Sequence, residues 1–278
     1  MAEIHHFAHG AFNPAAAFVM AFIGSLLGLI CTAQARTAST RGRQARWLVL
    51  ASIAIGGAAI WLMHFMAMLG FAVPASPVRY DPVLTLGSMG MAVLTVGIGL
   101  FIAGRGKRSG WRIMLGGLFT GLGVVGMHYV GMAAMRVYGR ISYAPNLVAA
   151  SVVIAVVAAT VALWFTVSIR GYGPILAAAF VMAIAVCGMH YTGMAAMRVD
   201  LFESGQGSVE GISPISLLVP ITLLASAALV AMAFSGLKAM TEEEFEAEPE
   251  PPTYGRHAET PFTLSTKPLS TKPLSTKI

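Results

Sequence analysis

Charged side chains are scarce in this sequence, and their scarcity excludes an ordinary water-soluble domain. Only 11% of the 278 residues are Asp, Glu, Lys or Arg, whereas 56% are hydrophobic. A typical soluble domain has about 25% charged residues, because its surface must face water. The composition therefore predicts an integral membrane protein.

Buried acids and useful cysteine pairs are also missing, which excludes several kinds of chemistry. The two cysteines, Cys31 and Cys187, are expected on opposite sides of the membrane, so they provide no disulfide framework. No carboxylate lies inside a long apolar run, and the last run has no lysine to hold a retinal. We therefore expect neither a proton pump of the retinal type nor an enzyme.

Seven uncharged runs are long enough to cross a membrane, which takes about 20 residues. Because backbone groups in lipid must be paired within each segment, runs of this length are expected to be helices rather than barrel strands. The predicted fold class is all-α, a polytopic membrane protein with seven transmembrane helices. The runs cover residues 15–33, 47–69, 83–103, 113–135, 147–168, 175–197 and 214–235.

Basic residues collect on one side of the predicted helices, and this asymmetry predicts the orientation. The basic side should face the cytoplasm, with the N-terminus outside and the C-terminus inside the plasma membrane. The net charge of +6 then reflects topology and requires no nucleic-acid partner. The residues of the basic side are Arg36, Arg41, Arg43, Arg46, Arg105, Lys107, Arg108, Arg112, Arg170 and Lys238.

Three regions are predicted along the chain: an external segment at 1–14, the membrane domain at 15–240 and a tail at 241–278. The tail is rich in Glu, Pro, Ser and Thr and repeats the letters LSTKP. Such a composition cannot bury enough apolar surface to order the chain, so a disordered cytoplasmic tail is expected. The external segment carries His5, His6 and His9.

A short motif with a histidine occurs three times at spacings of a little over sixty residues. GMHYVGMAAMR at 126–136 recurs with one exchange as GMHYTGMAAMR at 188–198, and LMHFMAMLGF at 62–71 is a looser copy. Each copy ends an apolar run that is expected to run outward. His64, His128 and His190 should therefore share one depth near the external surface. The predicted repeat is a pair of helices ending in a motif, used three times and closed by a seventh helix.

Methionines of the motif are predicted to share a helical face with the histidines, because residues at i, i+4 and i+7 lie within one arc. Met68, Met132 and Met194 are the predicted thioether ligands, and Met135 and Met197 are further candidates. Facing inward, these groups would surround one pocket that opens outward. Imidazole and thioether form a soft ligand set that suits Cu(I), so copper is the predicted cofactor. The neighbours assigned to packing or support are Met63, Met127, Met189, Tyr129, Tyr191, Gly131 and Gly193.

The triple repeat of Met, His and an aromatic residue resembles the MHYT domain, a bacterial integral membrane sensor module. The likeness extends from the first predicted helix to the seventh. It implies a bundle that binds copper near the extracytoplasmic face and through it senses a diatomic gas, such as oxygen, carbon monoxide or nitric oxide. At position 65 this chain has Phe where the family motif has Tyr. Many relatives carry a cytoplasmic signalling domain, so here we expect a cytoplasmic or membrane signalling partner.

Other functions remain open from the sequence alone. A redox signal would suit the same ligands as a gas. A copper acquisition or delivery protein would use the methionines and the external histidines, although the inner halves of the motif helices offer few donors for a pathway. A haem-binding electron carrier would use His/Met or paired histidine ligation.

Overall fold

The computed structural model describes residues 10–74, 76–104, 109–202 and 208–217, with a few isolated residues from 219 to 234. The predicted tail and the cluster of His5, His6 and His9 lie outside these residues. Nothing in the structure therefore bears on them.

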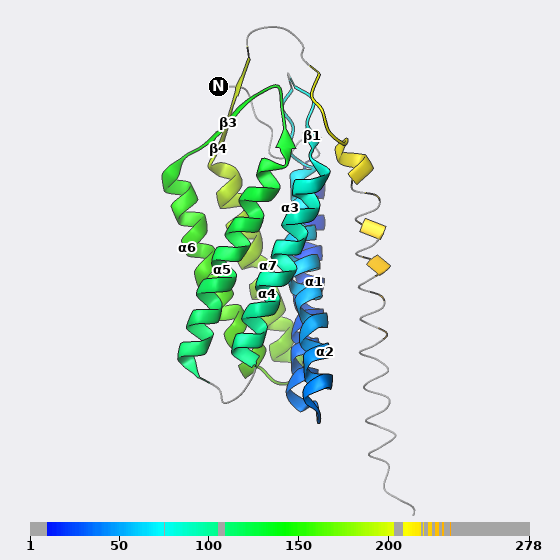
Figure 1. The fold of residues 1–278 in the computed structure, drawn as a ribbon, viewed down its shortest axis with the longest axis vertical. Coiled ribbons are helices and arrows are strands. Elements are labelled where there is room, and N and C mark those ends of the chain that lie inside the picture. Colours follow the sequence, from blue (N-terminus) through cyan, green and yellow to red (C-terminus); the bar gives the residue numbers. More distant parts are fainter. Residues whose placement is uncertain are drawn as a thin grey trace, which may run out of the picture. The chain divides into compact units, whose positions relative to one another are not determined.

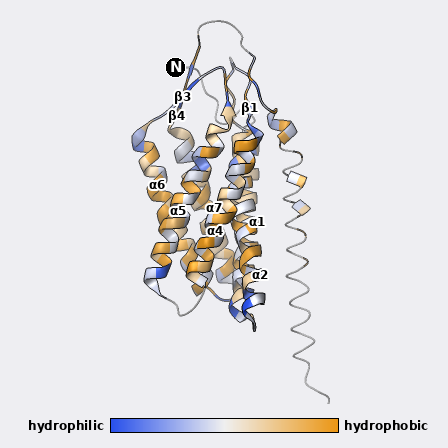
Figure 2. Ribbon diagram, in the orientation of Figure 1, coloured by the Kyte–Doolittle hydropathy of each residue, from blue (hydrophilic) through white to orange (hydrophobic). Residues whose placement is uncertain are grey.

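Six helical segments are long and apolar enough to cross a membrane, and they correspond to the first six predicted spans. They lie side by side, with hydrophobic residues along their length and hydrophilic residues nearer their ends (Figures 1 and 2). This agrees with a multi-pass membrane protein. The spans are α1 (Phe12–Thr37), a continuous helix composed of α2 (Arg41–Ser52), η1 (Ile53–Leu62) and α3 (Met63–Met68), then α4 (Pro82–Gly104), α5 (Gly110–Ala133), α6 (Pro145–Ser168) and α7 (Tyr172–Ala195).

The seventh predicted helix is not confirmed. Residues 214–217 are helical, and isolated helical residues follow up to 234, but the described part of this stretch contains no continuous span.

Four short strands at one end of the bundle show that the all-α prediction is incomplete. β1 (Arg79–Tyr80) pairs with β2 (Met135–Arg136), and β3 (Gly139–Tyr143) pairs with β4 (Met197–Leu201), both antiparallel. The chain leaves α5 and α7 at this end, where backbone groups freed from the helix need new partners, and the strands supply them. We call this end of the bundle the strand end.

The second span changes its winding just before its histidine. The ten residues of η1 form a π-helix, whose turns are wider than those of the α-helices on either side. Such segments are rare and often occur at functional sites. At its end, the Nε1 atom of Trp61 donates to Oγ of Ser88 at 3.0 Å and to the carbonyl of Thr85 at 3.2 Å. This side chain therefore anchors the π-helix to α4.

Asp81 connects the strand end to the start of α4. Its carboxylate accepts hydrogen bonds from the backbone N–H groups of Val83 at 2.9 Å and Leu84 at 3.1 Å, and it pairs with Arg136 of β2 at 2.5 Å. The bond from Leu84, followed by that from Arg136, lowers the pKa of Asp81. A lowered folded-state pKa stabilises the fold above the unfolded value of about 3.9. That stabilisation is lost as pH falls through the folded value.

Replacing Asp81 with Asn should remove this acid-sensitive contribution. We expect Asp81→Asn to melt at a modestly lower temperature at pH 7, and to lose less stability than the wild type as pH falls below about 4. Thermal unfolding in detergent across this pH range is the measurement. Glu210→Gln, which changes an exposed carboxylate, is the control and should behave like the wild type. Parallel acid curves for Asp81→Asn and the wild type would contradict the prediction.

Candidate metal centre

The three motif histidines meet between α3, α5 and α7, within the last turns before the strand end. Nδ1 of His64 lies 3.0 Å from Nδ1 of His190 and 3.2 Å from Nδ1 of His128. One ring nitrogen from each histidine lies within 4.8 Å of the other two, so the group could hold a metal ion. The structure thus brings together the three residues that the sequence predicted to converge. We call them the histidine triad.

The rings of the triad stand almost perpendicular to one another. Their centroids are 4.9, 5.0 and 5.2 Å apart, and their planes meet at 85, 79 and 89°. These nearly equal values place the rings around an approximate threefold axis, as three copies of one motif would. Each histidine is only 1% exposed. The predicted outward-opening pocket is therefore wrong, because the triad is enclosed.

Two of the rings rest against the glycine of the next motif copy. A Cβ atom placed on Gly131 would lie 2.5 Å from Nε2 of His64, and one placed on Gly193 would collide with Nε2 of His128. Neither of these Nε2 atoms has a hydrogen-bond partner among the described residues. Both glycines were predicted to support close helix packing, and their specific role is to make room for a histidine of the preceding copy.

The methionines one turn after each histidine are fully buried. Met68, Met132 and Met194 are 1, 0 and 4% exposed and belong to the main hydrophobic core. Their burial at the level of the triad leaves them as candidate ligands. Met63, Met127 and Met189 also carry a soft donor in every copy, but each directly precedes its histidine and so points about 100° away from it on the helix.

The later methionines do not lie on the helical face that the sequence predicted. α5 ends at Ala133 and α7 at Ala195, so Met135 and Met197 begin β2 and β4 instead of continuing the helices. Strand pairing sets their positions, opposite Tyr80 and Tyr143. Both remain buried.

The methionines directly before each histidine have packing neighbours. Met63 belongs to a second cluster with residues of α1 and α7, among them Ala17, Ala183 and Cys187. Met127 belongs to the main core, and Met189 lines an internal cavity. The packing role assigned to these methionines stays a prediction.

Each motif aromatic residue stands edge-on to its own histidine. The ring centroids of Phe65, Tyr129 and Tyr191 lie 4.9, 5.0 and 5.0 Å from those histidines. The hydroxyl of Tyr129 also shares a hydrogen bond of 2.9 Å with Ser151 of α6. Tyr129 therefore ties α5 to α6 instead of pointing at the triad.

Three residues near the site were missed by sequence reasoning: Trp61, Tyr80 and Ser151. Tyr80 packs on Phe65 with ring centroids 5.9 Å apart, and its hydroxyl donates to the carbonyl of Met68 at 3.4 Å. Burial raises the pKa of Tyr80 above its ordinary value, so this hydroxyl stays protonated. Trp61 is replaced by Val125 and Cys187 in the other copies, and Tyr80 and Ser151 lie outside the motif, which is why the motif gave no sign of them.

Comparison with known proteins identifies the family. Residues 57–117, 121–179 and 184–248 each match the MHYT family, described as a bacterial signalling protein N-terminal repeat. These matches cover more than half of the chain. The chain belongs to the MHYT family. Each matched repeat begins a few residues before a histidine of the triad. The family repeat therefore starts near the motif, whereas the sequence predicted a helix pair that ends with it. The predicted unit is not confirmed.

Several similar proteins are signalling proteins or enzymes of cyclic di-GMP metabolism. The chain is 36% identical over 217 residues to the bifunctional diguanylate cyclase/cyclic di-GMP phosphodiesterase MucR of Pseudomonas aeruginosa, covering 74% of this chain and 31% of MucR. It is 37% identical over 151 residues to the cyclic di-GMP phosphodiesterase NbdA of the same organism, covering 52% and 19%. It is 32% identical over 158 residues to the signaling protein YkoW of Bacillus subtilis, covering 54% and 19%.

The chain thus spans less than a third of the length of these relatives. No solved structure matches it. The family and its relatives support a role in sensing or signalling at a membrane.

Proposed function

We propose that this chain is a membrane sensor module whose histidine triad holds a copper(I) ion and responds to a diatomic gas or a redox signal. The observation that carries the proposal is the convergence of three imidazoles, with Nδ1 atoms 3.0 and 3.2 Å apart, in the buried interior of the bundle. Bound copper would supply a site at which a small ligand coordinates. The protein holds the imidazoles in place and excludes water.

The spacing of the triad fits a small ion after a minor adjustment. Nitrogen ligands that bind a metal at about 2.0–2.1 Å stand roughly 3.3–3.6 Å apart in tetrahedral or trigonal geometry. The two Nδ1 separations are a few tenths of an ångström shorter. Without an ion, Nδ1 of His64 carries either one N–H or one lone pair, so it can form a well-aligned hydrogen bond with only one of the other two Nδ1 atoms at a time. A cation between the three nitrogens would bind all three lone pairs at once.

The charge of the surroundings favours a monovalent ion. The membrane spans contain no carboxylate near the triad, and both cysteines are free thiols. Neutral imidazoles leave the whole charge of the ion uncompensated in a dry interior, where each unit of charge is costly. Cu(I) carries less charge than Zn²⁺, Mg²⁺ or Ca²⁺ and accepts few, soft ligands. Met68, Met132 and Met194 are the proposed thioether ligands, with Met135 and Met197 as further candidates.

The packing of the triad weighs against haem and against delivery of copper. A haem would have to separate rings whose centroids are 4.9–5.2 Å apart and which contact one another edge to face. A delivery protein needs an exit, but each histidine of the triad is only 1% exposed.

The remaining parts of the proposal concern orientation and output. The excess of Arg and Lys at the end opposite the strands supports an extracytoplasmic strand end and a cytoplasmic C-terminus. The module is proposed to be sensory, not catalytic, and to pass its signal to a cytoplasmic or membrane partner. Helices α3, α5 and α7 carry the triad, so a change in its geometry would move all three.

Metal content and spectroscopy test the proposed site. The full chain, purified in detergent under reducing conditions, should hold about one copper per chain and show no Soret band. X-ray absorption at the copper edge should show two or three nitrogen neighbours, with a sulfur neighbour if a methionine binds. Purification with zinc alone, or with haem, would contradict the proposal.

A further inference from the structure

An apolar cavity of about 60 Å³ lies between the helices, on the side of the histidine triad away from the strand end. Residues from all six described spans line it. Three of them, Ile60, Val124 and Val186, precede the three histidines by four residues, which is one helical turn. The cavity therefore ends one turn from the imidazoles, on the side away from the strand end.

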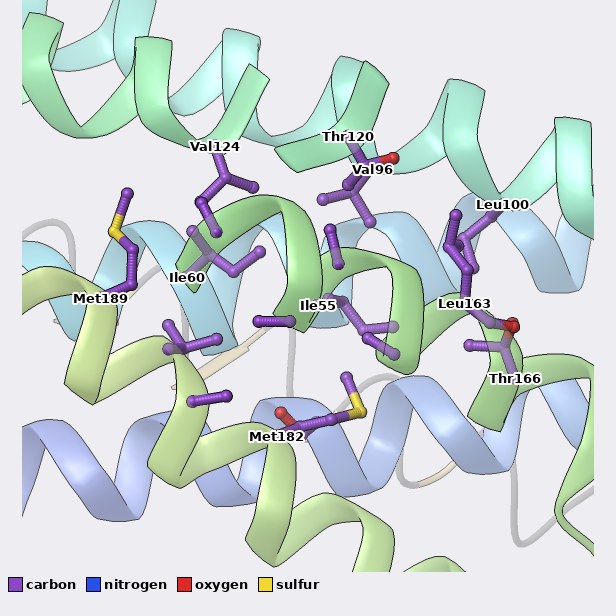
Figure 3. A pocket seen from close by; sticks show the side chains of 17 residues that line it. Ile55, Ile60, Val96, Leu100, Thr120, Val124, Leu163, Thr166, Met182 and Met189 are labelled. Carbon is purple, nitrogen blue, oxygen red and sulfur yellow. The ribbon is translucent and has the colours of Figure 1, made fainter. Parts of the chain in front are cut away.

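Figure 3 shows how the cavity extends along the helices. Met189 and Val124 lie at one end, and Leu100 and Thr166 lie at the other. Alanines at positions 155, 158, 159 and 162 of α6 line one side, and their small side chains leave the space open. The cavity thus extends along the bundle, with one end close to the triad.

The lining contains no charged group and little that is polar. The hydroxyl of Thr166 donates to the carbonyl of Leu163 at 2.7 Å, and that of Thr120 donates to the carbonyl of Thr95 at 3.4 Å. The hydroxyl of Ser25, on α1, is fully buried and has no hydrogen-bond partner among the described residues. The cavity therefore offers one unused hydrogen-bonding group in otherwise aliphatic surroundings.

Size and chemistry together narrow the class of occupant. The volume exceeds the roughly 10–15 Å³ that one water molecule needs, but a buried water also needs two to four polar partners. It is far below the roughly 300–1,000 Å³ of sites for drug-sized ligands. A small, uncharged molecule that makes at most one weak hydrogen bond meets both limits. Apolar cavities of this kind stay dry and bind xenon.

We propose that this cavity is a second binding site, which holds a diatomic gas and supplies it to the triad. The supply step rests on the proposed function, since it needs a metal in the triad to receive the gas. Binding of a gas in the cavity does not depend on the metal. The two parts can therefore be tested separately.

Xenon binding to the metal-free protein tests the cavity. Saturable xenon binding, measured by ¹²⁹Xe NMR on the full chain in detergent, is expected for the wild type. Ala159→Leu places a larger side chain in the cavity and should abolish binding. Ala149→Leu makes the same change at an exposed position of the same helix and should retain it. If Ala159→Leu does not fold, Ala158→Leu fills the same space from the adjacent position.

Carbon monoxide rebinding to the copper(I)-loaded protein after flash photolysis tests the supply step. We expect rebinding at least fivefold slower in Ala159→Leu than in Ala149→Leu, at equal copper content. Absence of saturable xenon binding in the wild type would overturn the gas site. Loss of xenon with unchanged carbon monoxide rates would overturn the supply step. Failure to load copper would refute the proposed function and leave the xenon result standing.

Discussion

Replacing any one residue of the histidine triad with Ala is expected to lower the copper retained per chain at least tenfold. Each ring supplies one of three converging nitrogens, and its loss leaves the ion with two imidazoles in a dry interior that offers no replacement. A tenfold loss corresponds to about 1.4 kcal/mol of binding free energy. Elemental analysis of detergent-purified protein and Cu(I) titration against a competing chelator measure the effect.

The triple variant at His64, His128 and His190 should lose little more copper than a single variant, because residues that act as one site are not additive. Replacing His5, His6 and His9 with Ala serves as the control, and this variant should retain copper.

Replacing Met68, Met132 or Met194 with Leu tests the thioethers, because Leu has a similar volume and has little effect on packing. Unfolding of the metal-free variants shows whether the bundle survives. Equal copper in the wild type and a folded triple variant would disprove the site.

Features encoded by local pattern could be predicted from the sequence. The six described spans follow from uncharged runs of sufficient length, because lipid forces such runs into helices. The meeting of the triad follows from equal spacing of three motifs on helices that run in one direction. Three residues at equal depth, in copied surroundings, converge once the bundle closes.

Features that depend on distant partners could not be predicted. β1 and β3 are two and five residues long, and each pairs with residues far along the chain, such as Arg79 with Arg136 and Gly139 with Leu201. Nothing in two residues marks them as a strand. For the same reason the ends of α5 and α7 were placed too late, so Met135 and Met197 were assigned to a helical face.

The enclosure of the triad and the π-helix η1 also required the structure. Sequence periodicity places His64 on an α-helical wheel, whereas the wider turns of η1 change its angle relative to the rest of the second span. The repeat showed that Gly131 and Gly193 occupy equivalent positions. It could not show that each faces a histidine of another copy, because that contact joins two different helices.

The contact between Gly193 and His128 leads to the second prediction with a large effect. Gly193→Ala should lower copper affinity at least tenfold and also lower the melting temperature, because its Cβ would occupy the space of the His128 ring. Overpacking in a filled core costs about 1–3 kcal/mol. The displaced ring would carry Nδ1 away from the ion. Gly131→Ala should act in the same way through His64.

Gly188→Ala provides the matched control on the same helix, since no atom lies within 4 Å of a Cβ at this position. It should leave copper affinity unchanged and stabilise the helix by up to about 1 kcal/mol, because Ala is the better helix former.

A double-mutant cycle identifies the cause of the Gly193→Ala penalty. In a protein that already carries His128→Ala, adding Gly193→Ala should cost almost no further stability, since the colliding ring is gone. Equal penalties for Gly193→Ala with and without the His128 ring would show that the glycine serves helix packing alone.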